Sequence, residues 1–115
     1  MTTFTLHTEE SAPAASKALL TGAKQSYGFV PNLYAAQAEA PALLEGYLSL
    51  AKIFDKTALS ETERQIIMMS NNRLNGCSYC MAAHTSIAQG AKVPADVIES
   101  LRTGTALSDP KLEAL

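Results

Sequence analysis

The chain has 115 residues, a length that suits one domain able to bury a core without disulfide cross-links. Hydrophobic residues make up 47% of it, charged residues 17%, and the net charge is −2. The composition is therefore neither that of a disordered chain nor that of a polyanion-binding protein. No apolar run approaches the roughly 18 residues of a membrane span. The first ten residues lack the basic and apolar regions of a secretory signal, so we expect a cytoplasmic protein with no nucleic-acid or membrane partner.

Alanine and leucine dominate the sequence while β-branched and aromatic residues are sparse, which favours helices over strands. We therefore expect an all-α bundle of about six helices in a single domain, residues 1–115, with residues 1–10 as an N-terminal arm. The positions of proline and glycine predict three helices in the first half of the chain: from about Ser11–Pro13 to Gly28, from Leu33 to Glu39, and from Pro41 to Phe54.

The second half of the chain begins with the clearest helix start. Ser60 followed by Glu63 is a capping box, and this predicted helix ends at Asn75-Gly76, where glycine suits the left-handed position after a helix. Two more helices and a short C-terminal turn are expected after it: a helix from Cys77 to about Gln89, a helix that Pro94 opens and that ends before Gly104, and a turn that starts at Ser108-Asp109-Pro110. That turn is an apolar stub, which we expect to dock on another element, such as a neighbouring subunit.

The most informative stretch is Cys77-Ser78-Tyr79-Cys80-Met81-Ala82-Ala83-His84. On a helix, Cys77, Cys80 and His84 share one face, because residues three and four apart are neighbours. Helix geometry places the two cysteine Cα atoms about 5 Å apart, inside the range that a disulfide spans. The pair can therefore interconvert between dithiol and disulfide with little backbone movement.

The position of this pair at a helix start also activates a thiol. Unpaired N–H groups and the positive end of the helix dipole stabilise a thiolate there, which lowers its pKa from roughly 8.5 towards neutrality. His84 lies one turn beyond Cys80 and can accept its proton. A thiolate attacks the O–O bond of a peroxide, becomes a sulfenic acid and condenses with a neighbouring thiol. The motif therefore holds the groups that such a cycle needs.

The segment Leu59-Ser60-Glu61-Thr62-Glu63-Arg64-Gln65, followed by Asn75-Gly76 and the CxxCxxxH motif, resembles the carboxymuconolactone decarboxylase/alkylhydroperoxidase D family. Gly28–Tyr34 and Pro41 resemble one branch of it, and the resemblance covers about Tyr27 to Leu101. It implies an all-helical fold, assembly into trimers or hexamers, and thiol peroxidase or disulfide reductase activity. It also implies the roles of the motif residues: Cys80 attacks the peroxide, Cys77 resolves the sulfenic acid, and His84 belongs to the proton relay.

Gln65 marks a departure from the family. The family's relay usually includes a glutamate twelve residues before the first motif cysteine, and Gln65 occupies that position here. Glutamine can orient a water or a thiol but cannot take up a proton at pH 7. Gln65 is therefore a candidate site residue that orients its neighbours, and an ordinary helix residue is the equally weighted alternative. Glu63 points about 160° away on the same helix, so we expect it to cap the helix rather than to replace the missing carboxylate.

Other assignments compete for the motif residues. A zinc site built from Cys77, Cys80 and His84, with His7 as a fourth ligand, is disfavoured because ligands at this spacing on one straight helix do not converge on a tetrahedral centre. His84 could otherwise be a histidine of the core. Tyr79 is expected to pack between subunits or to line a pocket, and His7 to be a solvated residue of the arm.

We therefore predict a cytoplasmic thiol-dependent peroxidase that reduces hydroperoxides through Cys77 and Cys80, with neither metal nor cofactor. Its expected partners are a hydroperoxide substrate, an external dithiol reductant such as a lipoyl domain or a thioredoxin-like protein, and further copies of itself. Two alternatives stay open. One is a decarboxylase acting on a lactone, against which the paired cysteines count. The other is a non-catalytic redox sensor or scaffold, which the replacement of the relay glutamate by Gln65 favours.

Overall fold

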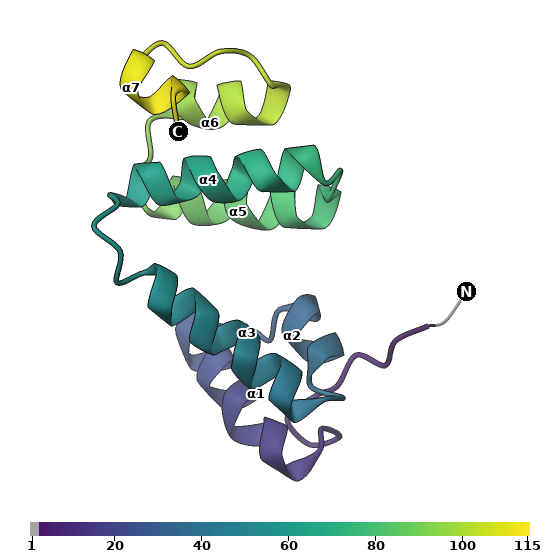
Figure 1. The fold of residues 1–115 in the computed structure, drawn as a ribbon. Coiled ribbons are helices and arrows are strands. Elements are labelled where there is room, and N and C mark those ends of the chain that lie inside the picture. Colours follow the sequence, from purple (N-terminus) through teal and green to yellow (C-terminus); the bar gives the residue numbers. More distant parts are fainter. Residues whose placement is uncertain (1–2) are drawn as a thin grey trace. The chain divides into compact units, whose positions relative to one another are not determined.

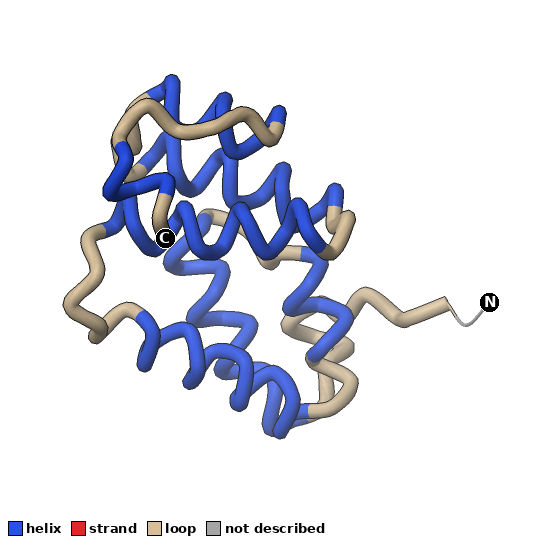
Figure 2. Tube along the Cα trace, turned by 45° about the horizontal axis from the view of Figure 1, so that its top comes forward, coloured by secondary structure: helices blue, strands red, loops and turns tan. Residues whose placement is uncertain are grey.

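The structure is a computed structural model that describes residues 3–115, and over these residues it contains helices and loops but no strand (Figure 2). The prediction of an all-α fold is therefore confirmed. Figure 1 labels seven helices in the described part of the chain: α1 (Ala14–Tyr27), α2 (Asn32–Gln37), α3 (Pro41–Phe54), α4 (Glu61–Leu74), α5 (Ser78–Gly90), α6 (Ala95–Thr103) and α7 (Pro110–Glu113). None of these helices has the length and apolar character that a membrane crossing requires.

Contacts divide the chain into two compact units, Met1–Lys56 and Thr57–Leu115, each with its own core. In the first unit α3 packs against both α1 and α2. The buried core of this unit is small and is formed by Ala12, Leu20, Ala38 and Leu44. The hydroxyl of Ser16, which is fully buried, donates a hydrogen bond to the backbone oxygen of Ala38 at 2.7 Å, so this buried polar group is satisfied.

The predicted N-terminal arm forms contacts with the helical part of the first unit. Residues 1 and 2 lie outside the described residues, and residues 3–8 form no helix. His7, however, is not the solvated residue that we expected, because its side chain is only 11% exposed. Its backbone N–H donates to the oxygen of Ala35 at 3.1 Å, and its Nε2 pairs with the carboxylate of Glu39. The expectation failed because these partners lie far along the chain from His7.

The second unit is built on α4 and α5, which run antiparallel and pack along their length (Figure 1), and α6 packs against both. Its core contains one methionine among aliphatic residues: Ile66, Met69, Ala88, Val93, Val97, Ile98 and Leu101. The predicted capping box of α4 is confirmed. Ser60 N–H donates to Glu63 Oε2 at 2.7 Å, and Glu63 N–H donates to Ser60 Oγ at 3.2 Å.

The C-terminal stub, α7, docks on its own unit. Leu112 is partly buried against the core of α4, α5 and α6, and Lys111 Nζ lies 3.1 Å from Glu63 Oε1 at the start of α4. The carboxylate of Glu113 also accepts the backbone N–H of Leu107 at 2.6 Å. Our expectation of docking is confirmed, and the element on which Leu112 docks belongs to the same chain, while Leu115 stays 50% exposed.

Candidate functional site

The turn between α4 and α5 places the cysteine pair at a helix start. Helix α4 ends in a Schellman motif, in which the N–H of Cys77 donates to the oxygen of Asn72 at 2.9 Å and the N–H of Gly76 donates to the oxygen of Arg73 at 3.0 Å. Gly76 has φ 62°, in the left-handed region that glycine enters without a steric penalty. The next helix therefore begins immediately after Gly76, with Cys77 as its N-cap residue, as predicted.

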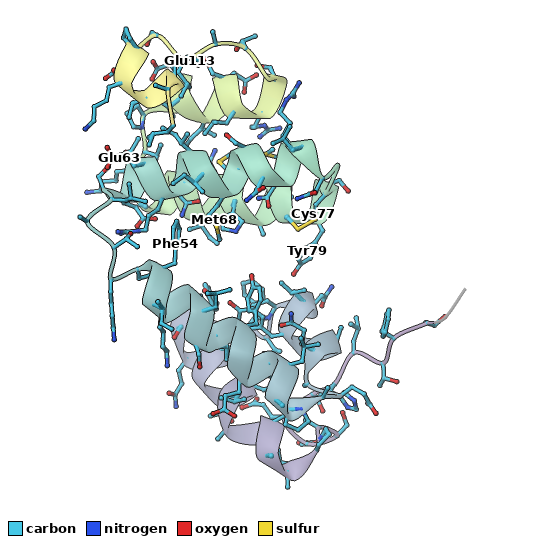
Figure 3. All side chains as sticks on the ribbon, in the orientation of Figure 1. Phe54, Glu63, Met68, Cys77, Tyr79 and Glu113 are labelled. Carbon is cyan, nitrogen blue, oxygen red and sulfur yellow. A yellow bond between two sulfur atoms is a disulfide. The ribbon has the colours of Figure 1, made fainter. Side chains whose placement is uncertain are left out.

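Cys77 and Cys80 are joined in a disulfide, and their Cα atoms are 5.3 Å apart, close to the separation expected from helix geometry. The backbone N–H of Cys80 donates to Cys77 Sγ at 3.2 Å, so this sulfur acts as the N-cap acceptor of α5. Figure 3 shows the disulfide beside the α4–α5 turn, with Tyr79 standing out from the first turn of α5. Reduction of the disulfide would place two thiols where helix N–H groups favour the thiolate form.

His84 follows Cys80 by one turn on α5 and is half-buried. Its Nδ1 lies 3.0 Å from Oε1 of Gln65, a residue of α4. Burial lowers the pKa of His84 below its ordinary value of 6.5, and the negative charge of Glu61 partly opposes this shift. The imidazole is therefore neutral at pH 7 and can act as a base.

Gln65 connects His84 to a carboxylate. Its side chain is buried, with 6% exposure, and its Nε2 donates to Glu61 Oε1 at 2.8 Å. The two polar ends of the amide are thus both occupied, one by the imidazole and one by Glu61. Gln65 is therefore not simply a core-facing helix residue, because its side chain ties together two ionisable groups on different helices.

Glu61 is the site residue that sequence analysis missed. It lies four residues before Gln65 and so on the same face of α4, and that spacing is the signal that could have identified it. Arg64 Nη2 donates to Glu61 Oε2 at 2.6 Å. The hydrogen bond from Gln65 is the main cause that lowers the pKa of Glu61, and the bond from Arg64 adds to it. Glu61 is therefore a carboxylate at neutral pH.

Glu63 takes no part in this cluster. Its carboxylate accepts the N–H of Ser60 and pairs with Lys111, and these contacts lower its pKa to about 2. Figure 3 shows Glu63 at the end of α4 that is remote from Cys77. The expectation from helix periodicity, that Glu63 points away from the relay, agrees with these contacts.

Metal binding finds no support in the described residues. Over residues 3–115 no group of three or more His, Cys, Asp or Glu side chains is arranged to hold a metal ion. The sulfurs of Cys77 and Cys80 are bonded to each other, so in this state they offer no thiolate to zinc. His7, the fourth ligand considered from the sequence, pairs with Glu39 in the first unit.

A groove of about 470 Å³ runs along α5 but does not include the candidate site. Side chains of α5 and Arg102 of α6 line it: Ser78, Met81, Ala82, Thr85, Ser86, Gln89 and Arg102. The periodicity of an α-helix puts these positions on the side of α5 opposite to Cys80 and His84. The candidate site is therefore defined by the disulfide and its hydrogen-bonded neighbours and not by this groove.

The chain matches the carboxymuconolactone decarboxylase family over residues 38–109, a span that covers more than half of its length. The matched span contains both cysteines, His84, Gln65 and Glu61. No curated protein matches the chain.

Proposed function

The chain belongs to the carboxymuconolactone decarboxylase family, and we propose that it is a thiol-dependent peroxidase of the alkylhydroperoxidase type. The observation that carries this proposal is the redox pair: a Cys77–Cys80 disulfide at the start of a helix, with the basic imidazole of His84 one turn away on the same helix. These groups supply a nucleophile, a resolving thiol and a base.

In the first step of the proposed cycle, the thiolate of Cys80 attacks one oxygen of a hydroperoxide. An S–O bond forms, the O–O bond breaks, Cys80 becomes a sulfenic acid, and the leaving alkoxide takes up a proton to become an alcohol. His84 accepts the thiol proton of Cys80 and can return it to the leaving oxygen. The lowered pKa of His84 supports this role, because the imidazole is available as a base at neutral pH.

In the second step Cys77 attacks the sulfenic sulfur of Cys80, forming the disulfide and releasing water. The Cα separation of 5.3 Å lets this bond form within one helical turn. An external dithiol, such as a lipoyl domain or a thioredoxin-like protein, then reduces the pair and becomes a disulfide itself. The cycle consumes one hydroperoxide and one dithiol, needs no metal or cofactor, and suits the cytoplasm, where dithiols are regenerated.

Assembly into a homo-oligomer, a trimer or a hexamer, is part of the proposal. Three large apolar side chains of α3 are more than half exposed: Leu43 at 56%, Leu50 at 67% and Ile53 at 62%. Positions 43, 50 and 53 follow a helical stripe, which is the pattern of a helix face that packs against another surface. Light scattering at micromolar concentration is expected to give the mass of an oligomer, and a monomeric mass would contradict this part of the proposal.

The proposed activity is tested by mass spectrometry of the thiols of the reduced full-length protein after one equivalent of hydroperoxide. We expect the wild-type protein to form the Cys77–Cys80 disulfide with turnover when a dithiol is supplied. Cys77→Ser should accumulate a sulfenic acid on Cys80, because the resolving thiol is missing, whereas Cys80→Ser should not react. Thiols that stay free under stoichiometric peroxide would overturn the proposal.

The same variants separate the proposed activity from its alternatives. A disulfide that forms with peroxide but is never turned over by any dithiol would indicate a redox sensor. Activity on a lactone substrate that survives Cys80→Ser would indicate a decarboxylase, because that reaction does not depend on the redox pair.

A further inference from the structure

The ionised carboxylate of Glu61 determines which end of the Gln65 amide donates a hydrogen bond and which end accepts one. An ionised carboxylate can only accept hydrogen bonds, so the atom of Gln65 that lies 2.8 Å from Glu61 must be the amide nitrogen. The amide oxygen then faces His84 at 3.0 Å. Because a carbonyl oxygen can only accept, Nδ1 of His84 must carry a proton in this arrangement.

We propose that Glu61 is a positioning residue, which acts through Gln65 to hold neutral His84 in the tautomer protonated at Nδ1. The lone pair of the imidazole is then on Nε2, the nitrogen that Gln65 does not engage. The use of that lone pair as the base for Cys80 rests on the proposed peroxidase function. The tautomer itself does not rest on that function, because it follows from the hydrogen-bonding capacities of Glu61, Gln65 and His84 alone.

Glu61 is held in place for this task. Arg64 donates to Glu61 Oε2 through Nη2 at 2.6 Å and through Nε at 3.3 Å, while its Nη1 donates to the backbone oxygen of Leu59 at 2.6 Å. The guanidinium therefore keeps one carboxylate oxygen occupied and leaves the other, Oε1, to Gln65. A water molecule in the place of Glu61 could donate as well as accept, so it would not impose a direction on the amide.

Removal of the carboxylate releases the amide of Gln65. In Glu61→Ala the buried amide N–H₂ has lost its acceptor, and a half-turn of the amide would let it donate to Nδ1 of His84 instead. The proton of the neutral imidazole would then sit on Nε2. In Glu61→Gln the new amide can either donate to Gln65 or accept from it, so both orientations and both tautomers are allowed.

The tautomer is measured by nitrogen NMR of the oxidised full-length protein labelled with ¹⁵N-histidine, at a pH where the imidazole is neutral. The chain has two histidines, so a His84→Gln variant assigns the signals. We expect the Nδ1–H tautomer in the wild type. In Glu61→Ala and in Glu61→Gln nothing fixes the direction of the Gln65 amide, so we expect the Nε2–H tautomer to appear and a mixture of both to be observed. Glu63→Gln is the matched control, because it removes a carboxylate from the same helical turn without touching Gln65.

Two results would overturn the inference: a wild-type His84 in the Nε2–H tautomer, or a tautomer that does not change in Glu61→Ala and Glu61→Gln. The wild-type measurement stands even if a variant fails to fold. As a second readout, the reaction of the reduced protein with peroxide is expected to slow by about tenfold in Glu61→Ala and to stay unchanged in Glu63→Gln. If NMR gives the expected tautomers but the reduced protein does not react with peroxide, the proposed function is contradicted and the positioning role of Glu61 stands.

Discussion

The amide oxygen of Gln65 accepts a hydrogen bond from Nδ1 of His84 at 3.0 Å, although the two residues are 19 positions apart in the chain. This contact joins α4 to α5 beside the redox pair and places a neutral amide where relatives of this chain are expected to have a carboxylate. The carboxylate, Glu61, is one helical turn further away, and its hydrogen-bond connection to His84 runs through the amide. The protonation of His84 therefore depends on two residues of α4.

Gln65→Glu is expected to destabilise the protein at pH 7, even though it restores the glutamate expected at this position. The new carboxylate would be buried and would face Oε1 of Glu61, which now accepts a hydrogen bond at 2.8 Å. The loss of the amide donor and the repulsion between two negative carboxylates should lower the free energy of unfolding by about 2–4 kcal/mol. Urea unfolding at pH 7 measures this loss.

The double variant Glu61→Gln/Gln65→Glu is the control for that prediction. It exchanges the two side chains, so that an amide at position 61 can donate to a carboxylate at position 65, which in turn accepts from His84. We expect it to recover at least half of the lost stability. A double variant as unstable as the sum of its parts would contradict the contact between these two positions.

The pH dependence of stability should contain a contribution from His84 on the acid side of neutrality. Burial lowers the pKa of His84, so the unfolded chain takes up this proton first as the pH falls below 6.5. The contribution is fully present above pH 6.5 and is lost as the pH drops through the folded-state pKa. Thermal unfolding between pH 8 and pH 5 is expected to show this decline in the wild type and less of it in His84→Gln.

An NMR titration of His84 tests the cause of that shift. The midpoint is expected below 6.5 in the wild type and lower still in Glu61→Gln, because the charge of Glu61 raises the pKa of the imidazole. Glu63→Gln should leave the midpoint where it is. A wild-type midpoint at or above 6.5 would contradict the burial of the imidazole as the dominant cause.

Glu63 should stabilise the second unit in a lower pH window. Its pKa is lowered to about 2, first by the hydrogen bond from the backbone of Ser60 and then by Lys111. The unfolded carboxyl titrates near 4.5, so the stabilisation is complete above that pH and is lost as the pH falls from 4.5 towards 2. We expect Glu63→Gln to flatten the decline of the melting temperature over this range. Glu99→Gln, an exposed change on α6, is the control and should keep the wild-type slope.

Gly76→Ala is expected to lower the free energy of unfolding by about 1–2 kcal/mol, because alanine pays for the left-handed conformation that glycine adopts freely. An added Cβ would meet no atom within 4 Å, so the cost comes from the backbone alone. Gly22→Ala, in the interior of α1 and equally free of neighbours, is the matched control.

The control variant, Gly22→Ala, should change the free energy of unfolding in the opposite direction. Alanine has the higher helix propensity, so Gly22→Ala is expected to stabilise by about 0.5–1 kcal/mol. Urea unfolding measures both variants. A neutral or stabilising effect of Gly76→Ala would show that the turn before Cys77 does not require a positive φ.

The features that could be predicted from the sequence all depend on short-range physics. Ser60 and Glu63 predict the start of α4, because both hydrogen bonds of a capping box form within four residues. Gly76 predicts its end, because few other residues adopt the left-handed conformation. The separation of Cys77 and Cys80 follows from helical rise and radius, which do not depend on the rest of the chain.

Contacts between distant segments were decided only by the tertiary structure. The pairing of His7 with Glu39, the docking of Leu112 on its own unit and the alignment of α4 with α5 all require parts of the chain to meet that no local pattern brings together. The site follows the same division. Local sequence placed two sulfurs and an imidazole on one helix face. The packing of α4 against α5 brought Gln65 to His84 and, through Gln65, made Glu61 part of the site. Only the tertiary structure could decide this, because hydrogen bonds between helices depend on the register of the two helices and not on spacing within either one.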